Sequence, residues 1–537
     1  MLESFVRAEG FSQVFGSVPR PLSSQGGGVR LSPGNSSGLS AGADSVQLPC
    51  NEPNTADRRK RVSHIQLELP MCIDRSTFSL DQPVSSLDPN RGTHEEAAEW
   101  LRHGPVVPVT LPDDVRAWAA VSAEAARSVL SEHPDLSSDP QYWGAYTSGK
   151  IPTGWPLLHL IVGKSLLNAD GAAHRRLRRL VSHAFTPRRI EALAPRIRET
   201  TRELLDGLEG VAVEEAIDLK ETFAYPLPLL IICQLYGLTD PDQQRQLCGH
   251  FRTILSVEVS SAERQAATIR EREVLARLVA DRRAAPLGDL TSALIEALDD
   301  GGGKLTQKEL IDTLELIFSA GHETTVNALT NTVLALLSHP DQLTAVLGGE
   351  VSWSAAVEAS LHWKAPLRTV FMRYALRDTV LYGVTVRRGE PIAVGLAAAN
   401  REQHAAVTAP FDIRAPRHFQ RQLAFGAGPH YCLGAPLARL QISIGLSQLF
   451  ARFPALRLAV PASELKPVIS TAIDGLAALP VVLRPASTQT PTTTPRSTNE
   501  PGARAAVTGV AGAVGPRGRD GVPERRCGPC EGEADGG

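Results

Sequence analysis

The feature that most constrains this chain is a glycine-rich loop with one cysteine, Cys432, at residues 425–439 (FGAGPHYCLGAPLAR). Gly426, Gly428 and Gly434 flank the cysteine, and glycine allows a backbone to adopt positive φ and to approach a flat ligand closely. The residues that follow are apolar at helical spacing, which predicts a helix. A cysteine just before a helix N-terminus has its thiolate favoured by the helix dipole. Such a thiolate can ligate a metal, although a lone cysteine is more commonly a buried structural thiol.

The loop resembles the haem-binding loop of the cytochrome P450 family, whose pattern is Phe-Gly-x-Gly-x-His-x-Cys-x-Gly. Every fixed position of that pattern is filled, by Phe425, Gly426, Gly428, His430, Cys432 and Gly434. The resemblance implies that these residues bind haem b (iron protoporphyrin IX), with Cys432 as the axial iron ligand and His430 beside a propionate. A thiolate ligand pushes electron density toward oxygen bound on the other side of the iron.

Composition excludes several other classes of protein. The chain has 537 residues and a formal net charge of -3, so no general attraction to nucleic acid or to membranes is expected. Seven cysteines, at 50, 72, 233, 248, 432, 527 and 530, are too few and too scattered for a disulfide framework. This usage favours the reducing cytoplasm. No uninterrupted apolar run reaches about 18 residues, so no membrane span is predicted, and the longest run, 227–236, is interpreted as a buried core helix.

The two ends of the chain differ in composition from its middle. Residues 1–70 are rich in Ser, Gly, Pro and Asn, which predicts a disordered extension or an incorrectly assigned start. Residues 486–537 are rich in Pro, Thr, Gly and Arg and are also predicted to be disordered. The CGPC motif at 527–530 lacks the strand and helix that a thioredoxin-type pair needs, so it is interpreted as incidental. The folded domain is expected at 72–485.

Hydrophobic periodicity predicts helices and short strands, and the P450 resemblance implies the mainly helical P450 fold with small β-sheets. Helices are expected at 94–104, 123–133, 170–190, over most of 190–300, at 306–340 and after 432. Strands are expected at 106–112 and 116–122 on either side of a turn at 112–114, within 384–399 and at 475–483. The loop-like residues 136–160 contain Trp143, Tyr146 and Trp155, which either cap a substrate pocket, as in the P450 family, or anchor a surface loop.

The basic segment 170–190 (DGAAHRRLRRLVSHAFTPRRI) is predicted to begin as a helix with Asp170 as its N-cap. His174 and Arg178 are spaced i,i+4 and share one face of that helix. Such a run is usually a solvated basic face. It is also similar to the P450 segment His-Thr-Arg-Leu-Arg followed by Phe-Thr-Pro-Arg-Arg. That resemblance implies that His174 and Arg178 bind a haem propionate and that the other arginines dock an acidic ferredoxin.

The helix at 306–340 is the longest that the sequence predicts, with a capping box at Thr306 and Glu309 and an end at Pro340. Its middle contains Gly321 and two threonines, which is typical of a strained, opened turn at a functional site.

The middle of this helix, residues 320–325 (AGHETT), resembles the P450 oxygen-activation motif Ala-Gly-x-Glu-Thr. The resemblance implies that Ala320 and Gly321 contact the haem. It also implies that Glu323 and Thr324 relay protons to the activated oxygen, with the Thr324 hydroxyl orienting a water and the Glu323 carboxylate connecting it to solvent.

One P450 feature is absent from the sequence. The family has a buried Glu-x-x-Arg pair, joined by a second arginine just before a later Phe-Asp. Alignment of VEASLHW places Ala359 and His362 at the positions of the pair, and Pro410 stands where the second arginine is expected. Removing one member of a buried charged network strands the others, whereas removing all of them can be nearly neutral. The sequence therefore predicts a genuine variant of the fold.

Three replacements for the missing network are open. Glu358 and His362 are spaced i,i+4 and could form a pair, of lower charge at neutral pH. Arg414 or Arg417 could also supply a partner.

The P450 resemblance assigns further site residues. Arg373 occupies the place of a propionate-binding arginine, and Pro366 with residues 367–372 would line the substrate pocket. Ile473 and Asp474 are expected to reach the substrate.

Together these motifs imply a bacterial, actinobacterial-type P450 that inserts one oxygen atom from O2 into a hydrophobic small molecule. Electrons would come from NAD(P)H through ferredoxin reductase and ferredoxin, and a monomer is expected. The missing network motivates a second interpretation, a haem-thiolate protein that binds or signals with weak or no turnover. The Glu323–Thr324 pair argues against that interpretation, and also against an enzyme that uses peroxide or rearranges its substrate.

Overall fold

The computed structural model describes residues 77–152, 155, 157–161, 165–212, 214–255, 259–298, 302–402, 411–414 and 422–483. All of them belong to one structural unit. The predicted extension at 1–70, the predicted tail at 486–537 with its CGPC motif, and the positions of Pro410 and Arg417 lie outside the described residues. The domain boundaries therefore stay a prediction.

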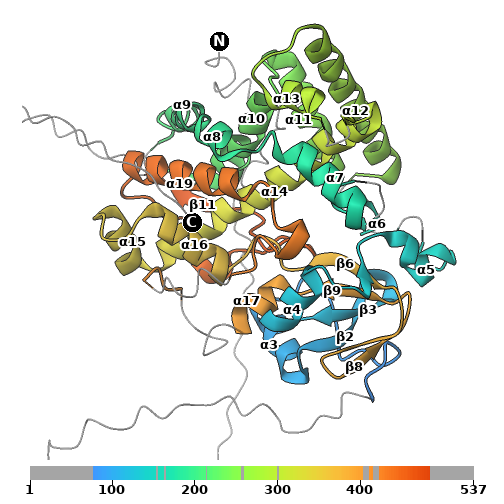
Figure 1. Ribbon diagram of the computed structural model, residues 1–537. Helices are drawn as coiled ribbons and strands as arrows, with labels where there is room; N and C mark the ends of the chain where they lie inside the picture. Colours follow the sequence, from blue (N-terminus) through green and yellow to red (C-terminus); the bar gives the residue numbers. More distant parts are fainter. Residues whose placement is uncertain are drawn as a thin grey trace, which may run out of the picture. The chain divides into compact units, whose positions relative to one another are not determined.

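The longest helix, α14 (Gln307–Ser338), runs through the middle of a helical bundle (Figure 1). The helices in contact with it include α10 (Pro226–Leu235), α12 (Ser261–Ala284), α13 (Leu290–Glu296), α15 (Pro340–Leu347), α16 (Trp353–Trp363) and α19 (Ala435–Arg452). The predicted capping box is confirmed, because the Thr306 hydroxyl accepts the Glu309 N–H and the Glu309 carboxylate accepts the Thr306 N–H. The predicted core helix is α10, which begins at Pro226 and is buried along most of its length.

The remaining helices surround this bundle or cover the sheet. They are α3 (Thr93–His103), α4 (Ala123–Leu130), α5 (Gly144–Thr147), α6 (Leu158–Ile161), α7 (Gly171–Ser182), α8 (Pro187–Glu191), α9 (Ala194–Asp206), α11 (Pro241–Leu255) and α17 (Leu396–Glu402). A π-helical turn at Lys220–Ala224 precedes α10. Within the described ranges, no helix is long and apolar enough to cross a bilayer.

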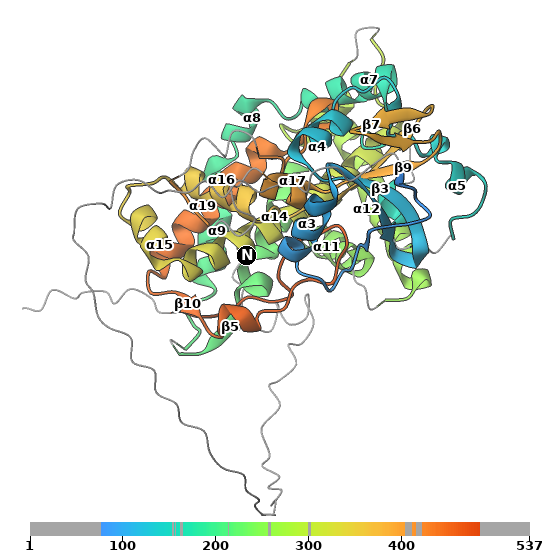
Figure 2. The ribbon, with the colours of Figure 1, turned by 90° about the horizontal axis from the view of Figure 1, so that it is seen from below.

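A mixed sheet lies to one side of the bundle (Figure 2). Its strands, in spatial order, are β1 (Ser85–Ser86), β2 (Val106–Leu111), β3 (Val115–Ala120), β9 (Pro391–Val394), β6 (Val370–Ala375) and β4 (Leu136–Ser137). The predicted hairpin of β2 and β3 around residues 112–114 is confirmed. The strand predicted to continue to residue 399 ends at Val394, and α17 follows it.

Two small sheets complete the fold. One contains β10 (Arg457–Leu458), β11 (Pro480–Val482) and β5 (Ala216–Asp218), and the other contains β7 (Thr379–Leu381) and β8 (Val384–Val386). The strand predicted within 475–483 is therefore present as β11.

The aromatic residues of the 136–160 segment anchor it to the sheet. The rings of Trp143 and Trp155 lie 5.5 Å apart, and Trp143 also stacks on Tyr374 of β6 at 5.8 Å. The Trp155 indole N–H donates a hydrogen bond to the Pro112 carbonyl at 2.8 Å. Both tryptophans are buried in the core beside the sheet. The anchoring interpretation is confirmed, and a role in capping a pocket stays a prediction.

Candidate functional site

The cysteine loop is shaped by two glycines with positive φ. Gly426 has a φ of 71° and Gly428 a φ of 68°, as the sequence predicts. A Cβ at Gly428 would lie 2.3 Å from the carbonyl oxygen of Leu130, at the end of α4, so only glycine fits there. Gly434 differs from the prediction, because it has a φ of -80° and serves as the N-cap of α19.

Cys432 lies just before α19, with its backbone N–H donating to the carbonyl of Phe425 at 2.9 Å. Burial raises the pKa of the Cys432 thiol, while the backbone N–H groups of Gly434 and Ala435 and the positive charge of Arg178 act to lower it. A bound metal cation would overcome the effect of burial, since a coordinated thiol is deprotonated. The surroundings of Cys432 therefore suit a thiolate ligand.

Four basic side chains converge beside the loop. The ring of His174 on α7 lies 4.1 Å from the ring of His430. Arg178, one turn later on α7, donates to the backbone carbonyl of Tyr431 at 2.6 Å. Arg373 on β6 is 7% exposed, and it donates to the carbonyl of Met372 at 3.1 Å. The structure thus brings together residues that the sequence could only place on separate elements.

Asp170 supplies the negative charge of this cluster. It is the N-cap residue of α7, as predicted, but its carboxylate makes no capping hydrogen bond to that helix. The carboxylate accepts hydrogen bonds from the Ser137 hydroxyl and the Ser138 N–H and lies 3.7 Å from Nε2 of His430. Burial alone would raise the pKa of Asp170, but the hydrogen bonds from His430, Ser137 and Ser138 hold it well below its usual value. Sequence reasoning missed this role because Ser137 and Ser138 are distant in the chain.

The cluster fits a group that carries carboxylates. Nε2 of His174 is buried without a hydrogen-bond partner among the described residues. Burial, with the charges of His430 and Arg178, lowers the pKa of His174 to about 4. Buried polar atoms are nearly always satisfied, and a buried guanidinium is costly unless an anion pairs with it. Together with the Cys432 thiol, these donors match a haem, whose propionates are anionic and whose iron takes a thiolate.

The middle of α14 is a continuous helix, so the predicted opened turn is wrong. The Thr324 hydroxyl donates to the Ala320 carbonyl at 2.7 Å, and the Thr325 hydroxyl donates to the Gly321 carbonyl at 2.8 Å. These bonds one turn back satisfy both hydroxyls within the helix. Packing explains the glycine at position 321, because a Cβ there would lie 3.3 Å from Cδ1 of Ile232 on α10.

The Glu323 carboxylate is held by a neighbour that the motif does not include. Nδ2 of Asn327 donates to Oε1 of Glu323 at 2.9 Å and to its backbone carbonyl at 2.8 Å. Asn327 is fully buried, and a Cβ at Gly475 would lie 1.8 Å from its Oδ1. Lys220 is a second neighbour, and it donates a hydrogen bond to the carbonyl of Leu476 at 2.7 Å. Burial lowers the pKa of Lys220, whereas the negative charge of Glu323 acts to raise it. The i,i+4 spacing of Glu323 and Asn327 could have predicted this contact from the sequence, because it places both side chains on one face of the helix.

Comparison with known proteins gives the family. The family model described as Cytochrome P450 matches residues 260–347 and 361–467. The 2-hydroxy-5-methyl-1-naphthoate 7-hydroxylase of Streptomyces carzinostaticus is 38% identical over 399 residues, which cover 74% of this chain and 97% of that protein. The chain belongs to the cytochrome P450 family.

Further relatives agree with this assignment. The 6-deoxyerythronolide B hydroxylase of Saccharopolyspora erythraea is 35% identical, over 72% of this chain and 95% of that protein. The solved structure of CYP154A1 from Streptomyces coelicolor A3(2) has a TM-score of 0.67 and 39% identity, and it covers 74% of this chain and 100% of that one. The predicted mainly helical P450 fold is confirmed, and the chain is a P450 monooxygenase.

The predicted replacements for the missing P450 network are wrong where the structure describes them. Ala359 and His362 are both buried on α16. Glu358 does not pair with His362; its carboxylate accepts hydrogen bonds from Arg439 on α19, with Nη2 to Oε2 at 3.2 Å. Arg414 lies at the surface, 3.5 Å from Glu350.

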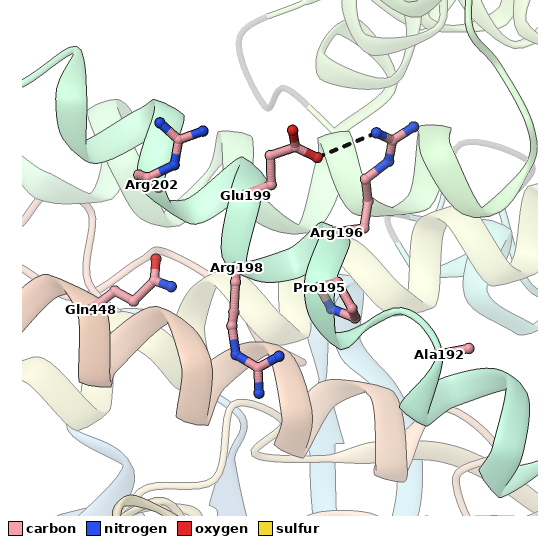
Figure 3. A pocket seen from close by; sticks show the side chains of 7 residues that line it. All are labelled: Ala192, Pro195, Arg196, Arg198, Glu199, Arg202 and Gln448. Carbon is pink, nitrogen blue, oxygen red and sulfur yellow. Dashed lines mark hydrogen bonds and ion pairs between the residues drawn. The ribbon is translucent and has the colours of Figure 1, made fainter.

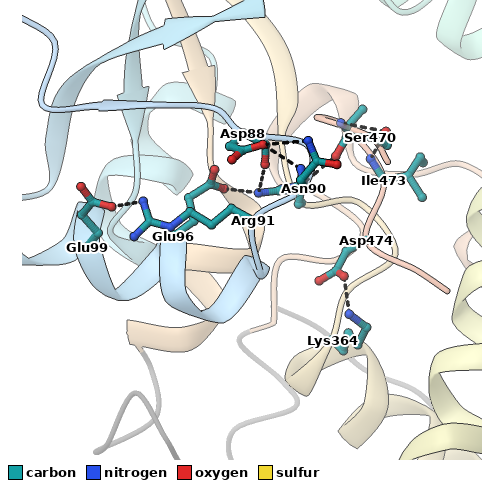
Figure 4. A network of polar contacts seen from close by, with 11 residues as sticks. Asp88, Asn90, Arg91, Glu96, Glu99, Lys364, Ser470, Ile473 and Asp474 are labelled. Carbon is teal, nitrogen blue, oxygen red and sulfur yellow. Dashed lines mark hydrogen bonds and ion pairs between the residues drawn. The ribbon is translucent and has the colours of Figure 1, made fainter. Parts of the chain in front are cut away.

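Residues expected to reach the substrate instead belong to a polar network (Figure 4). Asp474 is 5% exposed, and its carboxylate pairs with Lys364. Arg368, within the predicted pocket-lining tract, pairs with Glu96 of α3 at 2.6 Å, and both side chains are 3% exposed. This network ties α3 to the chain after α16 and to the loop at 470–474. The carboxylate of Asp474 is therefore directed at Lys364, contrary to the prediction.

A surface depression of about 580 Å³ lies between α9 and α19 (Figure 3). Its lining residues are Ala192, Pro195, Arg196, Arg198, Glu199, Arg202 and Gln448. None of the predicted site residues lines it, so it is separate from the cluster around Cys432.

Proposed function

We propose that this P450 holds haem b, with Cys432 as the axial iron ligand, and inserts one oxygen atom from O2 into a hydrophobic small molecule. The observation that carries the proposal is the convergence of donors beside the Cys432 loop, with Nε2 of His174 buried and unpartnered among the described residues. When bound, the haem would supply oxygen activation at a thiolate-ligated iron. The chain's own residues would position it and control protons.

Four residues would hold the propionates: His174, Arg178, Arg373 and His430. They come from α7, β6 and the loop, so the bound group would join three elements that are far apart in the sequence. Asp170 keeps His430 oriented through the contact with Nε2. Phe425, Gly426 and Gly434 would contact the haem through the loop, and Ala320 and Gly321 through α14.

Thr324 and Glu323 would manage protons on the α14 side. The Thr324 hydroxyl donates to Ala320, so its oxygen remains able to accept a hydrogen bond from a water. Glu323 would exchange a proton with that water, since Asn327 fixes Oε1 of the carboxylate and leaves Oε2 as an acceptor.

Redox partners and substrate class follow from the family. Electrons would pass from NAD(P)H through ferredoxin reductase and ferredoxin to a monomer in the cytoplasm. Two ion pairs, Arg175 with Glu132 and Arg176 with Glu309, reduce the positive charge of the predicted docking face on α7. Relatives named as hydroxylases of a naphthoate and of 6-deoxyerythronolide B support a hydrophobic natural product as substrate.

The reduced carbon monoxide spectrum of the purified protein tests the proposal. A long-wavelength Soret band is expected, because a haem iron held by a thiolate would give that signature with carbon monoxide. Folded, haem-loaded protein without the band would contradict the assignment of Cys432. Product formation with a ferredoxin, its reductase and a panel of polycyclic and macrocyclic substrates tests the reaction itself.

A further inference from the structure

We propose that Arg439, anchored by Glu358, braces the cysteine loop of this P450, which lacks the family's buried pair. The inference rests on the proposed role of Cys432 as haem ligand. It concerns how the loop is positioned, and Arg439 is a positioning residue because it acts through Phe425 and Tyr431.

The anchor is a two-point ion pair between α19 and α16. Nε and Nη2 of Arg439 donate to the two carboxylate oxygens of Glu358. The Arg439 side chain is 32% exposed and that of Glu358 is 19% exposed, so the pair is partly shielded from water. The amide of Gln422 donates to Oε2 of Glu358 at 3.3 Å and restrains the carboxylate further. A two-point pair fixes the plane of the guanidinium as well as its position.

The guanidinium also contacts the loop at two places. Its Cζ lies 4.3 Å from the ring centroid of Phe425, which is the distance of a cation–π contact. Nη1 of Arg439 lies 3.4 Å from the Tyr431 hydroxyl, to which it donates. Phe425 begins the loop and Tyr431 precedes Cys432, whose N–H bonds to the Phe425 carbonyl. Displacement of Arg439 therefore releases the residue that begins the loop and the residue just before the cysteine.

Glu358 occupies a different place on α16 from the two positions of the family's buried pair. Ala359 and His362 are buried on α16. Glu358 is one residue earlier, which rotates its side chain by about 100° around the helix. It meets α19 there, and α16 and α19 are in contact. Glu358 thus holds Arg439, and Arg439 contacts the loop.

The first experiment measures loss of the thiolate bond in the holoenzyme. Arg439→Met, Arg439→Lys and Glu358→Gln are compared by the rate at which the long-wavelength band of the reduced carbon monoxide complex decays. Arg439→Met should accelerate the decay roughly tenfold, since it removes a cation–π contact and a charged pair. Arg439→Lys should lie between this variant and the wild type, because it keeps the charge without the two-point geometry.

Arg452→Met is the matched control. Arg452 lies on the same helix, is 37% exposed and pairs with Asp206 at 2.8 Å and with Glu209, but it does not contact the loop. Its decay rate should stay within about twofold of the wild type, as for an exposed ion pair. A wild-type rate in Arg439→Met, or equal acceleration in Arg452→Met, would overturn the proposal. Acceleration in Arg439→Met but not in Glu358→Gln would overturn the anchoring role of Glu358.

Hydrogen exchange of the loop separates this inference from the proposed function. Amides in residues 425–434 of the holoenzyme should exchange faster in Arg439→Met and Glu358→Gln than in the wild type or Arg452→Met. If Cys432 is not the ligand, the wild type lacks the long-wavelength band while the exchange difference persists. If the brace is absent, the wild type shows the band and the exchange rates of all four proteins agree.

Discussion

The middle of α14 and the cysteine loop both carry complete P450 motifs, yet they are supported in different ways. The helix satisfies its own threonine hydroxyls one turn back and holds Glu323 with Asn327 from the same helix. The loop relies on other elements, on Arg178 of α7 and on Arg439 of α19. A motif within a helix can keep its geometry by itself, whereas a loop motif depends on residues elsewhere in the chain.

This difference shows where the sequence is free to vary. The partners of the helix motif all lie within one turn on the same helix, with Thr324 bonded to Ala320 and Glu323 held by Asn327. The loop keeps its own motif although Ala359 and His362 stand at the positions of the family's buried pair on α16, and Glu358 of the same helix anchors Arg439. Support that comes from outside a motif can be replaced by another residue that reaches the same place.

The largest expected effect is that of Cys432→Ser, which removes the one loop residue that no neighbour can replace. The long-wavelength Soret band of the reduced carbon monoxide complex should disappear, and product formation should fall below detection. Cys233→Ala is the control, since Cys233 is a buried cysteine on α10 that should leave the spectrum unchanged. A retained band in Cys432→Ser would show that another residue ligates the iron.

The next largest effect tests the helix. Thr324→Ala should reduce the fraction of consumed electrons that appears in product by roughly tenfold or more, because a general acid–base relay contributes at least that much. The measurement is NAD(P)H consumed, peroxide released and product formed in the same reaction. Thr325→Ala is the matched control, since its hydroxyl makes the same bond one turn back but is 3% exposed. Equal uncoupling in both variants would place the effect in helix structure and contradict the relay.

A third prediction tests whether removing both partners of a buried ion pair costs less stability than removing one. Arg368→Met should lower the free energy of unfolding by about 3–5 kcal/mol, because it strands Glu96 without its partner. The double variant Glu96→Leu with Arg368→Met should recover most of that loss. Chemical denaturation of the holoenzyme measures both. If the double variant is as unstable as the single one, the tolerated loss of the charges at positions 359 and 362 needs a different explanation.

The effect that is smallest per step of the measurement concerns the pH dependence of stability at α12, which packs on α14. Burial, with the charge of Glu315, raises the pKa of Glu271 to about 8, and Arg272 only partly opposes this. A raised carboxyl pKa contributes stability that is complete below its usual value of 4.5 and is lost as pH rises toward 8. The unfolding free energy of the wild type should therefore fall relative to Glu271→Gln by about 1.4 kcal/mol per pH unit between those values. Parallel pH profiles of the two proteins would contradict the assignment.

Much of the site could be predicted because it depends on local spacing. The i,i+4 relation of His174 and Arg178 put them on one face of a helix, and the capping box at Thr306 fixed where α14 begins. The glycines of the loop showed where the backbone takes positive φ at Gly426 and Gly428. Each of these features is decided by residues within about one helical turn or one loop.

The rest depended on tertiary partners that spacing cannot show. Asp170 has the residue type and place of an N-cap, but its carboxylate accepts hydrogen bonds from Ser137 and Ser138, which are distant in the sequence. Glu358 had a possible partner one turn away, but Arg439 of α19 offered a second hydrogen bond. The turn at 320–325 contained residues that weaken a helix, yet packing of Gly321 on Ile232 and the threonine hydrogen bonds kept it closed. In each case a long-range contact outweighed a weak local preference.

Gly475 has a consequence for how such an enzyme can be redesigned. Any side chain there would meet Asn327 at 1.8 Å and push it away from the Glu323 carboxylate. In a mutant library that varies the loop at 470–476 to accept new substrates, substitutions of Gly475 would therefore uncouple electron consumption from product formation, even where they improved selectivity. Screens scored on product alone would misread such variants as poor binders. Keeping Gly475 fixed separates the choice of substrate from the efficient use of reductant.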